Sequence, residues 1–213
     1  MTKLNSGDRP EGGAGQSLEN DPLGNEVDTV RARILRGAVI TFGRLGYGNA
    51  SVEAILDEAG VSRRTFYKHF RSKEDVFRAL YDRAVERLMV AVRTAEVPKA
   101  GGVAARVQRA VEAYIQVHEK AGPLARVMLL EQFAPGSPLA AQRAEAMDSF
   151  SRLISNAAKK AGVTDLDPIL VSAVVAGINR ICIQVAVQAG EAHWDTDRAM
   201  QAISRLLRAL EER

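Results

Sequence analysis

The chain has 213 residues, of which 46% are hydrophobic, enough to build the core of one or two domains. Its formal net charge of +3 is modest, so total charge alone does not indicate a nucleic-acid partner. A single cysteine, Cys182, excludes an intrachain disulfide and disfavours a cysteine-based metal site. The first residues lack the basic start and apolar run of a secretory signal, so we expect a cytoplasmic protein without cofactor or metal.

The N-terminal segment, residues 1–25, has a composition that does not favour folding. It contains five glycines and two prolines, and its leucines are isolated from one another. Such a segment cannot bury enough apolar surface to offset the entropy lost on ordering. We therefore expect a disordered tail.

From Val27 onward the apolar residues recur at helical spacing, and neither strand alternation nor a two-residue hairpin signal appears in the sequence. The pattern predicts an all-α chain. Glycines and hydroxyl-bearing caps divide its first part into four helices, which begin near Val27, Ser51, Ser62 and Ser72. Asp75 is placed to complete a capping box with Ser72. Five further helices are expected at 103–121, 123–134, 137–161, 168–189 and 195–212.

The stretch from Ser51 to Asp75 has the outline of a helix-turn-helix. Two short helices flank the tight turn Ala59-Gly60-Val61, whose small residues allow a close helix crossing. The second helix of such a motif enters the DNA major groove. A helix of seven or eight residues is roughly 11 Å long, which fits a groove about 12 Å wide.

The second helix of this motif is strongly basic. Between Ser62 and Lys73 the charged residues are all lysines and arginines, while Phe66 and Phe70 repeat at a four-residue interval and are expected to face inward. Arginine can donate two hydrogen bonds to one guanine, whereas lysine, tyrosine and histidine at the groove rim suit phosphate. The alternative is a solvated basic face on a structural helix, which the flanking turn and caps make less attractive.

These residues resemble the signature of TetR-type transcriptional regulators. The similarity runs through Ser51-Val52-Glu53-Ala54-Ile55, Ala59-Gly60-Val61-Ser62, Thr65-Phe66-Tyr67-Lys68-His69-Phe70 and Ser72-Lys73-Glu74, and it covers about Val27 to Leu80. The rest of the chain matches only in length and helix count. Three positions depart from the family pattern: Ala50 where threonine is frequent, Leu56 where alanine is frequent, and Arg64 where glycine is frequent.

The resemblance implies a nine-helix, Ω-like homodimer that binds double-stranded DNA. It implies phosphate contacts from Ser51, Tyr67, His69 and Lys73. It also implies a groove-facing set at the start and middle of the second helix, comprising Ser62, Arg63, Arg64, Thr65 and Lys68. In this reading residues 26–72 form the DNA-binding domain, and residues 73–213 form a helical ligand-binding and dimerisation domain.

The helices at about 168–189 and 195–212 are expected to pair with a second copy of the chain. The first is apolar nearly all round, and Arg180 disfavours a membrane span because a charge at mid-bilayer costs at least about 2.5 kcal/mol. The second presents a narrow apolar seam. It consists of Met200, Ile203, Leu207 and Leu210.

A small-molecule pocket is expected among the helices after residue 103, since bundle cores often hold one. The candidate lining residues are Tyr114, His118, Met128, Gln132, Phe133, Met147, Phe150, Asn179 and Ile183. They suggest a mainly apolar effector with one or two hydrogen-bonding groups, although each alone is more often ordinary core. The fourth helix would carry the effector's signal to the DNA-binding part, and release of a repressor by ligand is the outcome the resemblance favours.

Two other functions compete with this reading. An architectural DNA-binding protein would have the same N-terminal motif but a solid C-terminal core, so a cavity there separates the two. An enzyme is disfavoured because His69, His118 and His193 lie far apart, and because no phosphate loop, nucleophile elbow or metal motif is found in the sequence.

Overall fold

The computed structural model describes residues 29–94, 103–134, 136–160, 162, 165–187 and 196–211. The predicted tail at 1–25 lies outside them. Within them every regular element is an α-helix, as the sequence predicts. Three helices form a head that we define as residues 29–72: α1 (Val30–Asn49), α2 (Val52–Ala59) and α3 (Arg63–His69). The helices that follow are α4 (Lys73–Thr94), α5 (Val103–Glu131), α6 (Ala140–Lys160), α7 (Pro168–Val187) and α8 (Thr196–Glu211).

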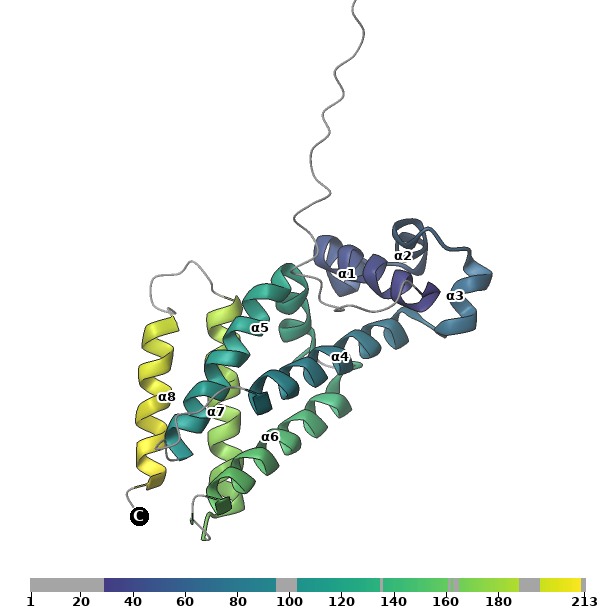
Figure 1. Cartoon of the computed structure of the whole chain (residues 1–213). Helices are drawn as coiled ribbons and strands as arrows, with labels where there is room; N and C mark the ends of the chain where they lie inside the picture. Colours follow the sequence, from purple (N-terminus) through teal and green to yellow (C-terminus); the bar gives the residue numbers. More distant parts are fainter. Residues whose placement is uncertain are drawn as a thin grey trace, which may run out of the picture.

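The head lies at one end of the molecule and α7 and α8 at the other, with α4, α5 and α6 running between them (Figure 1). α3 occupies the outer edge of the head, and α8 lies at the opposite edge of the molecule. No described helix combines the length and hydropathy that a membrane span requires.

The short helices of the head begin and end where their capping residues stand. Ser51 and Ser62 accept hydrogen bonds from the backbone N–H groups of Ala54 and Thr65, both at 3.1 Å. A serine cap of this kind contributes about 1 kcal/mol. Gly60 ends α2 in the left-handed conformation with a φ of 60°, which glycine adopts without steric cost. These local signals set the direction in which α3 leaves α2.

The capping box at α4 differs in one partner from the predicted one. The Ser72 hydroxyl accepts from the Asp75 N–H, as expected. The Asp75 carboxylate, however, accepts from the N–H of Arg71 at 3.0 Å, one residue before the cap. The two interactions satisfy one backbone donor in the first turn and one just before the helix, so α4 begins at the predicted place.

The predicted break at Gly122-Pro123 is absent, because α5 continues through both residues. Its two halves belong to different cores. Leu124 and Met128 join the cluster that contains the aromatic residues of the head, whereas Val111 and Ile115 pack with α7 and α8. Since α1 itself consists of two helices joined at a kink at Gly46, the eight labels cover nine helical segments in the described residues.

The core of the head extends beyond the predicted domain boundary at 72/73. Phe42 of α1 meets Phe77 of α4 edge-on, with ring centroids 5.1 Å apart, and Tyr47 stacks on Phe77 at 4.5 Å. Deeper in, the Tyr81 hydroxyl donates to Oε1 of Gln132 at 3.2 Å. The head is therefore packed against α4 and the second half of α5 as one hydrophobic unit.

Candidate DNA-binding and effector sites

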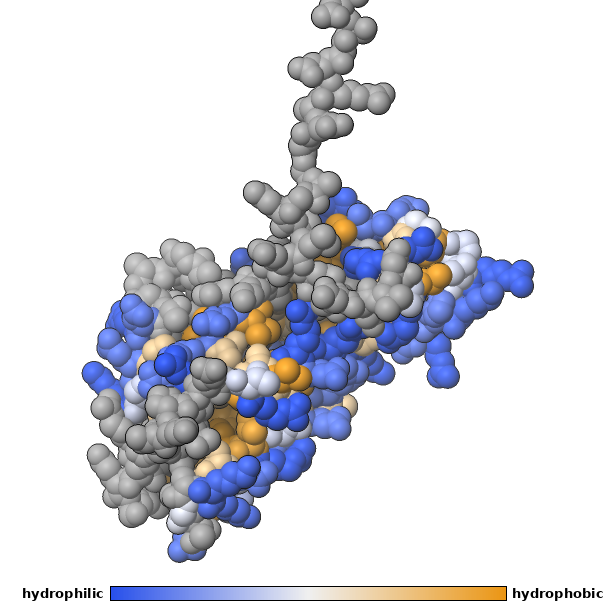
Figure 2. Space-filling view, in the orientation of Figure 1, coloured by the Kyte–Doolittle hydropathy of each residue, from blue (hydrophilic) through white to orange (hydrophobic). Residues whose placement is uncertain are grey.

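α3 is anchored by one side and exposed on the other. Phe66 is fully buried and Phe70 nearly so, whereas Tyr67 remains 50% exposed. Arg63, Arg64, Lys68 and His69 are all exposed as well. The outer tip of this end of the molecule is hydrophilic, while apolar patches lie further in on the head (Figure 2). The predicted inward and outward faces of the helix are thus the observed ones.

The two arginines at the start of α3 differ in what they contact. The Arg63 guanidinium donates to the carboxylate of Glu53 on α2. The backbone N–H of Glu53, aided by Arg63 and Ser51, lowers the pKa of that carboxyl, so it is ionised at neutral pH. Arg64 has no hydrogen bond or ion pair within the described part of the chain. Its guanidinium is therefore the more available of the two for contact with a base.

The polar residues around the turn between α2 and α3 serve partly as structural groups. The hydroxyl oxygens of Ser62 and Thr65 lie 2.9 Å apart and bond to one another. The hydroxyl of Ser51 accepts the N-terminal backbone hydrogen bond of α2. Both serines nevertheless remain exposed at the start of their helices, and Tyr67 and His69 are exposed as well.

Lys73, an expected phosphate contact, binds within the protein in this structure. Its Nζ donates to the backbone oxygens of Tyr47, Gly48 and Ala50 at 2.9, 3.3 and 2.7 Å, and it lies 4.7 Å from the centre of the Tyr47 ring. A lysine ammonium has three donors, and three carbonyls occupy them here. Lys73 thus caps the end of α1 and ties α4 to it, while its charge adds to the positive field of the head.

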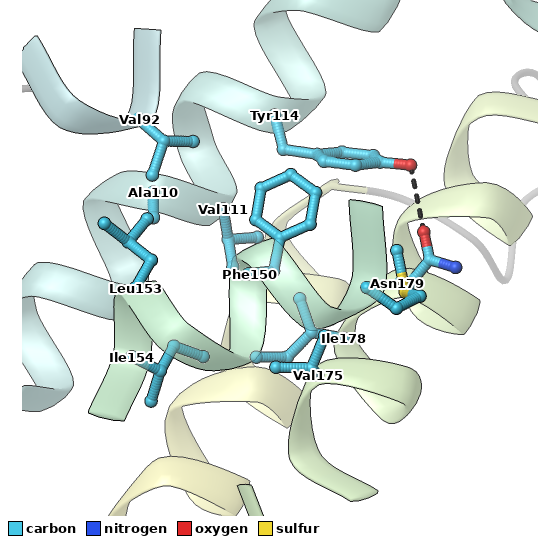
Figure 3. A pocket seen from close by; sticks show the side chains of 11 residues that line it. Val92, Ala110, Val111, Tyr114, Phe150, Leu153, Ile154, Val175, Ile178 and Asn179 are labelled. Atoms are coloured by element: carbon cyan, nitrogen blue, oxygen red, sulfur yellow. Dashed lines mark hydrogen bonds between the residues drawn. The ribbon is translucent and has the colours of Figure 1, made fainter. Parts of the chain in front are cut away.

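A cavity of about 60 Å³ lies between α4, α5, α6 and α7. Four of the predicted lining residues surround it: Tyr114, Met147, Phe150 and Asn179. The Tyr114 hydroxyl donates to Oδ1 of Asn179 at 3.2 Å across one end of the cavity (Figure 3). The remaining lining residues are apolar: Val92, Ala110, Val111, Leu153, Ile154, Val175 and Ile178.

The other predicted lining residues do not surround this cavity. Met128 is buried on the second half of α5, which faces the head, and Gln132, buried just after the end of that helix, accepts a hydrogen bond from Tyr81 of α4. Phe133 follows the end of that helix and is 48% exposed, with the Arg143 guanidinium 4.7 Å above its ring. Ile183 is buried on α7 but is not among the lining residues, and the side chain of His118 lies outside the described residues.

Most of the lining residues that the sequence analysis missed are close helical neighbours of those it found. Ala110 and Val111 precede Tyr114 by four and three positions, and Leu153 and Ile154 follow Phe150 by the same steps. Residues three or four apart share a helix face. Extending each candidate by one turn would have found these positions, whereas Val92 on α4 has no such signal.

The face that α7 leaves exposed carries small and apolar residues. Ile169 is 79% exposed, and Ala173, Ala176 and Arg180 continue the same face at helical spacing. The predicted seam of α8 points elsewhere: Ile203 is fully buried within its own subunit, against Val111 and Val174, and Met200 packs beside it. The side chains of Leu207 and Leu210 lie outside the described residues. In its described part, the seam packs intramolecularly.

Comparison with known proteins identifies the head. Residues 34–80 match the family model described as bacterial regulatory proteins, tetR family. The chain is 31% identical over 136 residues to the HTH-type transcriptional activator FasR of Mycolicibacterium smegmatis, and 34% identical over 73 residues to the HTH-type transcriptional regulator UidR of Escherichia coli K12. These matches span 63% and 34% of this chain, but only 58% and 37% of the two relatives.

The fold is shared along most of the chain. A solved bacterial regulatory protein of the tetR family from Rhodococcus RHA1 superposes with a TM-score of 0.63 at 24% identity, covering 86% of this chain and 98% of the other. The match of the head residues, the curated relatives and the common all-helical architecture agree with the sequence signature. Residues 34–80 thus match the tetR family of bacterial regulatory proteins, and the chain shares the fold of a solved member of that family.

Proposed function

We propose that this protein is a ligand-responsive transcriptional regulator that acts in the cytoplasm. In this proposal a homodimer binds a near-palindromic operator through α3, and a small, mainly apolar effector releases it. The observation that carries the proposal is α3 itself: a short basic helix, held from beneath by Phe66, whose Arg64, Lys68 and His69 are exposed at the edge of the molecule.

The exposed side chains of α3 divide by reach and chemistry. Arg64 lies in the first turn of α3, the part that meets base edges in a helix-turn-helix. Its free guanidinium supports a bidentate contact with guanine. Tyr67, Lys68, His69 and the serine caps are better suited to phosphate. Lys73, with its ammonium bound to three carbonyls, is less available for phosphate than these residues.

One short α3 helix contacts few bases, so we expect a dimer to bring a second α3 to the DNA. Two α3 helices about 34–36 Å apart would occupy successive turns of the major groove on one side of DNA. The exposed face of α7 supports such a contact, because alanines allow two helices to approach closely and Ile169 otherwise exposes a large apolar side chain to water. We assign α7 and the outward face of α8 to this interface.

The cavity supports an effector and favours a regulator over an architectural DNA-binding protein. At about 60 Å³ it is smaller than the roughly 150 Å³ of an apolar cavity that holds benzene. An effector must therefore enlarge it, and Phe150 together with the Tyr114–Asn179 hydrogen bond lies where that enlargement would occur. The cavity lining includes residues of α4 and α5, and both helices also pack against the head. This arrangement supports coupling between effector binding and DNA binding.

We assign the sign of regulation as repression, the outcome that the family resemblance favours. The relative FasR is named an activator, so the sign needs its own test. A reporter placed behind the protein's own upstream DNA decides it. Expression that rises when the gene for this protein is deleted supports repression, and expression that falls contradicts it.

The DNA-binding part of the proposal is tested by fluorescence anisotropy with labelled DNA from upstream of the gene. Arg64→Ala removes two base contacts per dimer, each worth about 1–3 kcal/mol, so operator affinity should fall by at least about thirtyfold. Arg152→Ala, an exposed arginine on α6, is the charge-matched control and should leave affinity unchanged. Equal behaviour of the two variants, or no binding by the wild type, would overturn the proposal.

A further inference from the structure

One exposed arginine outside the helix-turn-helix is held against the end of α3. The guanidinium carbon of Arg31, in the first turn of α1, lies 5.1 Å from the centre of the Phe70 ring. Phe70 is the residue that ends α3, and its ring packs on Phe66 with centroids 6.0 Å apart. The buried aromatic pair that anchors α3 thus also provides the platform for Arg31.

The position of Arg31 differs from that of two other arginines of the head, which pair with carboxylates. Arg44 pairs with Glu58 at 3.7 Å, and Arg63 pairs with Glu53. For Arg31 the contact with the Phe70 ring is the interaction found among the described residues, and its side chain is exposed. A guanidinium over an aromatic face keeps its N–H groups at the edge of the ring available for another acceptor.

The end of α3 is where a phosphate would lie. α3 has seven residues and is roughly 10 Å long, whereas the major groove is about 12 Å wide. When the first turn of α3 meets the bases, its last turn approaches the sugar-phosphate rim. Lys68 and His69 are exposed in that last turn, beside the platform for Arg31.

We propose that Arg31 is a phosphate-binding residue and that the first turn of α1 is a third element of the DNA interface. The inference rests on the proposed function. Arg31 would fix the register of the head on the duplex without reading sequence, because a phosphate carries no base information. The Phe70 ring acts as a positioning group, since it limits the directions in which the long arginine side chain points.

The test measures affinity as a function of salt for Arg31→Ala, with Arg152→Ala as the control of equal charge. Each phosphate contact contributes about 0.9 to the slope of log affinity against log salt concentration. Loss of Arg31 from both subunits should lower the slope by about 1.8. Affinity for operator and for unrelated DNA should fall by the same factor, about three- to tenfold at moderate salt.

Phe70→Leu is the second variant, because it keeps an apolar residue in the core but removes the ring beneath Arg31. As a single substitution, Phe70→Leu should weaken DNA binding. Added to Arg31→Ala, it should weaken DNA binding little further. If the wild type binds operator but Arg31→Ala keeps the same salt slope, this inference is overturned while the proposed function stands. If the wild type binds no DNA, the proposed function itself fails.

Discussion

The head and the helical domain after it are both made of α-helices, yet different interactions determine their functional surfaces. In the head, serine caps, one left-handed glycine and a pair of phenylalanines fix the direction and exposed face of α3 within some twenty residues of sequence. In the helical domain, the cavity is formed by side chains from four helices spread over almost ninety residues. Local interactions determine the first surface, and long-range packing determines the second.

The first test of this difference concerns the head, at the point where α1 crosses α2. A Cβ at Gly37 would lie 2.8 Å from the backbone nitrogen of Ala59, and backbone yields little. We expect Gly37→Ala to destabilise the head by about 1–3 kcal/mol, measured by urea unfolding. Gly48→Ala, at the end of α1 beyond the kink, is the control, because no atom lies within 4 Å of its added Cβ. Equal stability of the two variants would show that α1 and α2 can move apart at their crossing without loss of stability.

The cavity provides the corresponding test in the helical domain, with two phenylalanines that the sequence alone does not distinguish. Phe150 lines the cavity, whereas Phe133 stacks under Arg143 outside it. Phe150→Ala should enlarge the cavity and raise affinity for the uncharged apolar dye Nile red by about tenfold, or about 1.4 kcal/mol. Phe133→Ala should leave dye binding unchanged. A similar response from both would mean that the dye binds elsewhere.

A hydrogen bond within the helical domain, beside the core that it shares with the head, gives a smaller effect. Tyr81→Phe removes the hydrogen bond to Gln132 and should cost about 1 kcal/mol in stability at neutral pH. Dye binding in the cavity is the internal control, because neither residue lines it. Unchanged stability at neutral pH would mean that this bond contributes nothing to holding α4 against the end of α5.

The same tyrosine predicts a pH dependence at the alkaline end. Burial raises the pKa of Tyr81 to about 12, and burial chiefly raises that of Tyr47 to about 12. Because a tyrosine in the unfolded chain ionises near pH 10, this stabilisation is complete below pH 10 and is lost as pH rises through 12. Tyrosinate absorbance should show these late titrations, and Tyr81→Phe should remove one. Complete ionisation by pH 11 in the folded protein would contradict the burial.

The contrast between local interactions and long-range packing also explains which parts of each region the sequence predicts. Caps at Ser51 and Ser62, the turn at Gly60 and the inward Phe66 are visible as residue types at fixed spacing, so the head and its exposed basic face are predictable. The hydrogen bonds from Lys73 to the end of α1 cannot be predicted in this way, because they join groups more than twenty positions apart. Met128 and Gln132 are residue types that suit a pocket, yet they point toward the head side of the molecule. Their direction depends on the continuation of α5 past Pro123, where the sequence predicts a break.

The most direct measurement of the central claim is a footprint of guanine N7 methylation on DNA upstream of the gene. If paired α3 helices read adjacent major grooves, the wild type should protect guanines in two patches about 10 base pairs apart. Arg64→Ala should lose that protection, and Arg152→Ala should keep it. No protection, a single patch, or a pattern that survives Arg64→Ala would contradict the account.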